Sequence, residues 1–121
     1  MTDATTPTMT VTEAAARLDD EGDPRPLLVD VREANEFALL RVPGAVLMPL
    51  STLGASYERL PTDRPLFLMC AVGGRSARAT DFLRANGYAD ATNVAGGITA
   101  WNQAGLPVKT GAPVSGEGDL T

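Results

Sequence analysis

Hydrophobic positions along this chain fall into short blocks with two kinds of spacing. Continuous apolar runs over residues 27–31, 45–48 and 66–70 are typical of strands in a sheet that is covered on both faces. Helical patterns follow these runs at residues 14–18, 33–40, 51–60 and 76–86, and Ile98 and Trp101 share one more helical face. Strands that alternate with helices in this way predict an α/β fold, with a central parallel sheet flanked by helices on both faces.

Local signals set the limits of these elements. Thr10 and Glu13 match a capping box that opens the first helix, Ser51 is predicted to cap another, and Asn86 with Gly87 ends the helix at 76–86. Residues 1–9 lack periodicity and predict a flexible lead-in, while Gly, Pro, Ser and acidic residues over 110–121 predict a flexible tail. One folded domain over residues 10–109 is therefore expected.

The most informative stretch is the apolar run that ends in the only cysteine, Cys70. A loop containing two glycines follows, and a helix comes after it; the loop residues are Ala71, Val72, Gly73, Gly74, Arg75 and Ser76. The first turn of a helix has free N–H groups and a partial positive charge, and glycines with positive φ let successive amides converge on an anion. The sequence therefore predicts an anion cradle facing Cys70.

A thiol in such a cradle should have a lowered pKa, and the thiolate is its nucleophilic form. Buried free cysteine is more often an inert small hydrophobe, but an inert residue would lie inside its strand rather than at the end. We therefore predict that Cys70 is catalytic. For Arg75, contact with the substrate or thiolate and capping of another group both stay open.

Asp30 interrupts the apolar run at 27–31 and so places a carboxylate in a buried strand. A buried charge needs a partner, and Arg32 at the mouth of the same strand is the expected one. Because parallel strands open their sites at the carboxyl edge of the sheet, this pair is expected to fix neighbouring loops, and a direct chemical role for Asp30 or substrate binding by Arg32 stays open.

Composition narrows the functions open to the chain. With 121 residues it is expected to form one domain, and its net charge of -5 argues against nucleic acid or an anionic membrane as a partner. Neither an apolar run long enough for a membrane span nor a secretory signal pattern is found, so a cytoplasmic protein is expected. One cysteine and no histidine leave no internal disulfide and only carboxylates for a metal site, so no metal or cofactor is expected.

Four motifs resemble those of the single-domain rhodaneses, the thiosulfate-type sulfurtransferases, in their order and spacing. The resemblance covers about residues 10–108, and its motifs are Cys70–Ser76, Leu28–Glu33 followed by Glu36 and Phe37, Val42–Ala45 followed by Met48–Leu50, and Gly96–Trp101. In the motif that corresponds to Val42–Ala45, the family usually has a histidine two residues before the proline, and this chain has Arg41 at that position. We interpret Arg41 as a surface residue that forms hydrogen bonds and takes no part in the chemistry. Trp101 is expected in the core.

The resemblance implies a single rhodanese-like domain over residues 10–109 that transfers sulfur. Cys70 would take a sulfane sulfur from a thiosulfate-like donor, become a persulfide, and pass the sulfur to cyanide or a thiol by double displacement. Thiosulfate is the first expected donor, and mercaptopyruvate, glutathione persulfide or a protein persulfide stay open. The expected partners are these donors, cyanide or a thiol as acceptor, and, as an open alternative, a sulfur-relay protein.

Two alternatives remain at this stage. The domain can be a sulfur carrier, or a redox or scaffold module, that a partner protein loads without turnover of its own. It can also be a cysteine phosphatase or arsenate reductase, whose loops resemble this one but have one residue more than the four found here between cysteine and arginine. A shorter loop forms a smaller cradle, which suits a sulfur atom better than a tetrahedral oxyanion.

Overall fold

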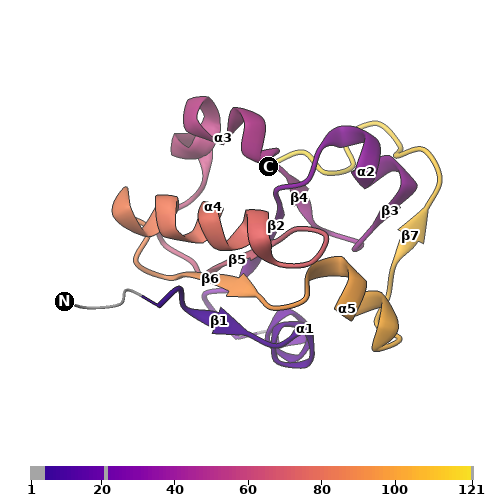
Figure 1. Cartoon of the computed structure of the whole chain (residues 1–121), viewed down its shortest axis with the longest axis horizontal. Helices are drawn as coiled ribbons and strands as arrows, with labels where there is room; N and C mark the ends of the chain where they lie inside the picture. Colours follow the sequence, from indigo (N-terminus) through magenta and orange to yellow (C-terminus); the bar gives the residue numbers. More distant parts are fainter. Residues whose placement is uncertain (1–4, 21, 121) are drawn as a thin grey trace.

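A parallel sheet of five strands forms the centre of the computed structural model, which describes residues 5–20 and 22–120 (Figure 1). Its spatial order is β1-β6-β5-β2-β4 and all neighbouring strands are parallel. The strands are β1 (Thr8–Met9), β2 (Leu27–Asp30), β4 (Val46–Leu47), β5 (Leu66–Met69) and β6 (Ala91–Val94). The predicted central parallel sheet is confirmed. Residues 1–4 of the predicted lead-in lie outside the described residues, and its last two residues form the edge strand β1.

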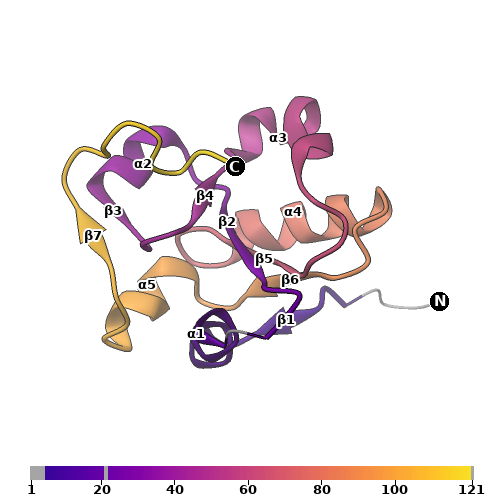
Figure 2. The same ribbon diagram turned by 180° about the vertical axis from the view of Figure 1, so that it is seen from behind.

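Helices cover both faces of this sheet, as predicted. In Figures 1 and 2, α3 (Leu50–Ser56) and α4 (Gly74–Ala85) lie on one side, and α1 (Val11–Asp19) and α5 (Gly97–Gln103) lie on the other. The shorter α2 (Ala34–Leu39) lies beside a small antiparallel pair of β3 (Leu40–Arg41) and β7 (Lys109–Thr110). The 3₁₀ helix η1 (Tyr57–Arg59) continues α3.

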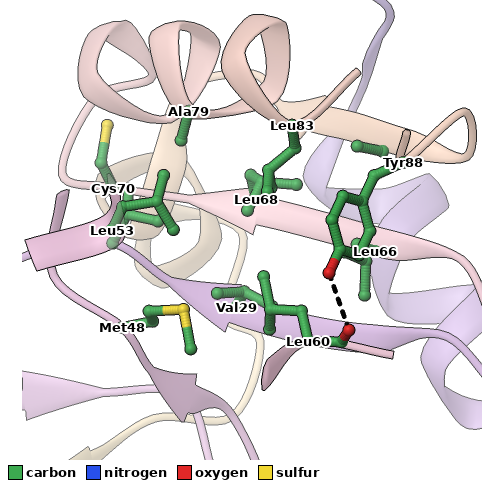
Figure 3. Close-up of a cluster of buried hydrophobic side chains, with 12 residues drawn as sticks. Val29, Met48, Leu53, Leu60, Leu66, Leu68, Cys70, Ala79, Leu83 and Tyr88 are labelled. Atoms are coloured by element: carbon green, nitrogen blue, oxygen red, sulfur yellow. Dashed lines mark hydrogen bonds between the residues drawn. The ribbon is translucent and has the colours of Figure 1, made fainter. Parts of the chain in front are cut away.

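The two faces of β5 explain why its sequence is a continuous apolar run. Leu66 and Leu68 pack in the cluster beneath α3 and α4 (Figure 3), whereas Phe67 and Met69 pack in the cluster on the opposite face. Successive side chains of a strand point to opposite faces, so a strand buried on both sides needs apolar residues throughout. Trp101 belongs to the second cluster and is 3% exposed, which confirms its predicted place in the core.

The structure confirms the predicted start of α1 and corrects that of α3. The capping box of α1 is present: Thr10 Oγ1 accepts from the amide of Glu13 at 3.1 Å, and Glu13 Oε1 accepts from the amide of Thr10 at 2.9 Å. The prediction of Ser51 as a helix cap is wrong, because α3 already begins at Leu50 after Pro49, and the fixed φ of proline suits a helix start. Ser51 Oγ donates instead to the carboxylate of Glu33.

The C-terminal segment packs against the domain, in contrast to the flexible tail that the sequence predicted. Strand β7 pairs with β3, the amide of Leu47 donates to the carbonyl of Gly118 at 2.8 Å, and Leu120 packs against the core cluster beneath α3 and α4. This segment is polar and rich in glycine, so it has no hydrophobic periodicity from which its packing could be predicted. Its order comes from contacts with residues far away in the sequence.

Arg41 holds this segment, and its predicted surface role is corrected. The residue is 2% exposed, its guanidinium pairs with the carboxylate of Glu117, and its Nη1 donates to the carbonyl of Gly111 at 2.6 Å. A buried guanidinium must be paired, and Glu117 lies 76 residues away along the chain. Sequence periodicity carries no signal for such a contact.

Acid should loosen this contact. The hydrogen bond from Arg41 lowers the pKa of Glu117 from 4.5 to about 2. A carboxyl whose pKa is lower in the folded than in the unfolded protein stabilises the fold above the unfolded value, and this stabilisation is lost as pH falls towards 2. Glu117→Gln should therefore lower the free energy of unfolding at pH 7 and weaken its dependence on pH between 5 and 2.

Urea unfolding at several pH values checks this prediction. Asp119→Asn is the matched control. Asp119 lies in the same segment, and its carboxylate forms no ion pair within residues 5–20 and 22–120. An acid dependence that is the same in Glu117→Gln and in the unmodified protein would contradict the role given to the pair.

Candidate active site

Cys70 follows β5 at the carboxyl edge of the sheet, where the neighbouring strand β2 ends in Asp30. The two strands pair in register, with Asp30 opposite Met69. Cys70 is 1% exposed, and its sulfur points towards the amino end of α4 (Figure 3). The predicted arrangement of strand, thiol, turn and helix is therefore present.

Hydrogen bonds from the loop converge on the sulfur. The amide of Gly73 donates to Cys70 Sγ at 3.1 Å, and Ser76 Oγ lies 3.3 Å from it. Burial is the largest single influence on the thiol and favours its neutral form. The hydroxyl of Ser76 and the amides of Ser76, Gly73 and Val72 together outweigh burial, so the pKa of Cys70 is lowered below its ordinary value of 9.0. This direction agrees with the sequence prediction and favours the nucleophilic thiolate.

Only one of the two loop glycines has the left-handed backbone that the sequence predicted for both. Gly73, the N-cap of α4, has φ of 111°, and a Cβ at this position would lie 3.3 Å from the amide nitrogen of Gly96. Gly74 is already the first helical residue, so its φ is not positive. The cradle is thus one left-handed turn followed at once by the free amides of the first helical turn.

The start of α5 supports the loop from behind. The amides of Ile98 and Thr99 donate to the carbonyls of Cys70 at 2.9 Å and Ala71 at 3.1 Å. Gly97 makes this approach possible, because a Cβ there would lie 2.3 Å from the carbonyl oxygen of Cys70. In the sequence, Gly97 stands out only as part of the motif Gly96–Trp101. Two adjacent glycines after a strand are a signal from which its close approach to another backbone could have been predicted.

Asn93 is a site residue that sequence reasoning missed. It lies on the neighbouring strand β6, is 6% exposed, and its Oδ1 lies 2.6 Å from Ser76 Oγ. A hydroxyl has one proton, so Ser76 donates to only one of Asn93 Oδ1, the sulfur and the carbonyl of Gly73 at a time. If the Asn93 amide turns by half a rotation, its Nδ2 donates to Ser76 and leaves the hydroxyl proton for the thiolate.

Removal of the Ser76 hydroxyl should make the thiol less acidic. In Ser76→Ala the rate of alkylation of Cys70 by iodoacetamide at pH 7 should fall about tenfold, because a hydrogen bond to a charged acceptor contributes about 1.5 kcal/mol or more. The pH profile of this rate measures the effect directly. Thr80→Val is the control, since the buried Thr80 hydroxyl donates to the carbonyl of Ser76 without contacting the sulfur. Equal profiles for all three proteins would show that Ser76 does not stabilise the thiolate.

Arg75 points to a carboxylate rather than to the sulfur. Its Nη1 and Nη2 donate to Glu36 Oε1 at 2.8 Å and Oε2 at 2.9 Å, and both side chains are about one-third exposed. The hydrogen bond from Arg75 lowers the pKa of Glu36 to about 2, so the carboxylate is charged at neutral pH. Of the two roles left open by the sequence, the structure shows contact with another group.

Asp30 and Arg32 form the buried ion pair that the sequence predicted. Arg32 Nη2 lies 2.8 Å from Asp30 Oδ2, and both side chains are at most 5% exposed. Arg32 also donates to the carbonyls of Glu36, within α2, and of Leu40, which directly follows it. The pair therefore fixes α2, and with it Glu36, beside the loop.

Other features of the described residues lie away from the thiol. A hollow of about 440 Å³ lies beside the start of β2, where Leu18, Trp101 and Pro107 line it, and Cys70 does not reach it. Within residues 5–20 and 22–120, no group of three or more potential metal ligands occurs. No helix in the same residues is both long and apolar enough to cross a bilayer.

Comparisons with known proteins agree with this geometry. A family model described as the rhodanese-like domain matches residues 10–104. A sulfurtransferase from Allochromatium vinosum is 37% identical over 82 residues, which cover 68% of this chain and 77% of that protein. The probable adenylyltransferase/sulfurtransferase MoeZ of Mycobacterium tuberculosis is 40% identical over 76 residues, but these cover 61% of this chain and only 19% of MoeZ.

Solved structures show the same fold. The crystal structure of a rhodanese-like domain protein from Staphylococcus aureus is similar with a TM-score of 0.74 and 36% sequence identity, over 86% of this chain and 99% of that one. The family model covers most of the chain. This protein therefore belongs to the family of rhodanese-like domains.

Proposed function

We propose that this domain is a sulfurtransferase that moves a sulfane sulfur from a thiosulfate-like donor to a thiophilic acceptor through a persulfide on Cys70. The observation that carries the proposal is the thiol itself, which lies beneath the loop amides and has a lowered pKa. Membership of the family and relatives named sulfurtransferase support transfer of sulfur in general.

In the first half-reaction, the Cys70 thiolate attacks the outer sulfur of the donor. The donor's S–S bond breaks, its electron pair leaves with sulfite, and a new S–S bond forms on Cys70. We expect the amides of Val72, Gly73 and Ser76, which stabilise the thiolate, to stabilise the negative charge on the terminal sulfur of the persulfide as well. The lowered pKa of Cys70 favours the thiolate, and the thiolate attacks without a general base.

In the second half-reaction, an acceptor attacks the terminal sulfur of the persulfide. With cyanide the product is thiocyanate, the S–S bond breaks, and the electron pair returns to Cys70 as the thiolate. No net oxidation occurs over the cycle, and donor and acceptor react in turn at one sulfur atom.

A sulfur carrier loaded by a partner protein is the second candidate. It is favoured by the match to MoeZ, a longer protein in which a similar segment makes up about a fifth of the chain. The phosphatase alternative is weaker, because the arginine that would hold a tetrahedral oxyanion points to Glu36 instead.

Intact mass measurements test the proposal. The reduced protein should gain the mass of one sulfur atom after brief exposure to thiosulfate, and cyanide should remove it with release of thiocyanate. No gain from thiosulfate, but a gain from a cysteine desulfurase supplied with cysteine, would favour the carrier. No gain from either source in protein whose thiol still alkylates would overturn sulfur transfer, and phosphate release from an aryl phosphate would then support a phosphatase.

A further inference from the structure

The charged groups beside the loop leave the site without a net positive charge. Arg75 is the only cation in the loop and is bound through both nitrogens to Glu36. Arg32 is bound through Nε and Nη2 to Asp30, and Glu33 adds a further carboxylate at the start of α2. A donor that approaches Cys70 therefore meets a rim that is neutral or acidic.

Arg75 lies within electrostatic reach of the sulfur. The pKa of Arg75 is raised first by its hydrogen bond with Glu36, and the negative charges of Glu36, Cys70 and Asp30 add to this effect. The Arg75–Glu36 pair is about one-third exposed, so it lies at the rim rather than beneath it. Nearby in the loop, Val72 presents an apolar side chain that is 68% exposed.

We propose that Glu36 is a specificity-determining residue, which neutralises Arg75 and so favours sulfur donors with one negative charge, such as organic persulfides and thiosulfonates, over doubly charged thiosulfate. This inference rests on the proposed function and names the class of donor for the same thiol. Val72 contributes an apolar contact that an organic donor can use and that thiosulfate cannot.

Donor charge gives the inference a quantitative form. The Coulomb energy between a donor and the carboxylate of Glu36 is proportional to the donor's charge. If removal of the Glu36 charge speeds the reaction of a singly charged donor by some factor, it should speed the reaction of a doubly charged donor by about the square of that factor. Any change in the reactivity of Cys70 itself affects both donors equally, so the ratio of the two rates reports only the donor's charge.

Methanethiosulfonate and thiosulfate are suitable probes, because both give the same Cys70 persulfide. They differ in charge and in the leaving group, which is methanesulfinate or sulfite. In Glu36→Gln at low ionic strength, the second-order rate of persulfide formation should rise about threefold with methanethiosulfonate and about tenfold with thiosulfate. The difference should shrink in high salt, because salt screens a partly exposed charge.

Arg75→Gln tests the inference even if Glu36→Gln fails to fold, and a double variant tests it in a third way. Arg75→Gln leaves Glu36 unpaired, so thiosulfate should slow more than methanethiosulfonate. The double variant Glu36→Gln with Arg75→Gln restores a neutral rim and should return the ratio to that of the unmodified protein. Glu58→Gln is the charge control, because Glu58 lies in η1 and its charge acts on Tyr88, which follows the carboxyl end of α4.

The outcomes distinguish a failure of the role proposed for Glu36 from a failure of the proposed sulfur transfer. Equal changes with both donors, or a ratio that Glu58→Gln shifts as much as Glu36→Gln does, would overturn the role of Glu36 while sulfur transfer still stands. A protein that forms no persulfide with either donor, although its thiol alkylates normally, would overturn the proposed function instead.

Discussion

Replacement of Cys70 with serine should abolish sulfur transfer while the fold stays intact. Cys70 is the only cysteine in the chain, so no second thiol can form the persulfide. A serine hydroxyl stays protonated at neutral pH and is a far weaker nucleophile, so thiocyanate production should fall roughly a thousandfold or more. The mass gain after thiosulfate should disappear completely.

Stability is the control for this variant. Serine is close to cysteine in size and can take over the hydrogen bond from the amide of Gly73, so the thermal midpoint should change little. Continuous thiocyanate assays together with thermal unfolding separate the two effects. Sulfur transfer that persists in a folded Cys70→Ser protein would place the chemistry on another group and contradict the central proposal.

Gly97→Ala should damage both the fold and the site. The residue has φ of +57°, and a Cβ would lie 2.3 Å from the carbonyl oxygen of Cys70 and 2.6 Å from that of Ala71. Both contacts are with backbone, which cannot move aside as a flexible side chain can. The free energy of unfolding should fall by about 3 kcal/mol or more, and the rate of persulfide formation should fall with it because the loop is displaced.

Gly105→Ala provides a matched comparison. Its φ is +75°, but nothing lies within 4 Å of the added Cβ. This variant should lose only about 1 kcal/mol, the ordinary cost of a left-handed alanine, and its rate of sulfur transfer should not change. Urea unfolding and persulfide formation measured on both variants test the argument. If the two variants lose the same stability and activity, the close approach of α5 to the loop is not what requires Gly97.

Much of the fold could be read from local patterns. Continuous apolar runs identified the strands ending near Asp30 and Cys70, because a strand buried on both faces has no polar side. The capping box at Thr10 set the start of α1 correctly, since a cap involves residues within a single turn. Boundaries were less accurate where several starts were possible, as at Ser51, where Pro49 opens the helix instead.

The sequence by itself also located the thiol and its loop, because a lone cysteine between an apolar strand and a glycine-containing turn leaves few other arrangements. It did not reveal which charged groups pair across the fold. Arg75 and Glu36 are 39 residues apart, Ser76 and Asn93 are 17 apart, and Arg41 and Glu117 are 76 apart. Hydrophobic periodicity encodes which face of an element is buried, and it carries no information about the partner of a charge.

Tertiary structure alone decided those pairings and the close approach of Gly97 to the loop. The chain has 15 acidic residues, and only the packing of α2 against the start of α4 selects Glu36 for Arg75. In the same way, only the fold of the C-terminal segment brings Glu117 to the buried Arg41. Burial makes a partner necessary in each case, but the three-dimensional arrangement of the elements determines which partner it is.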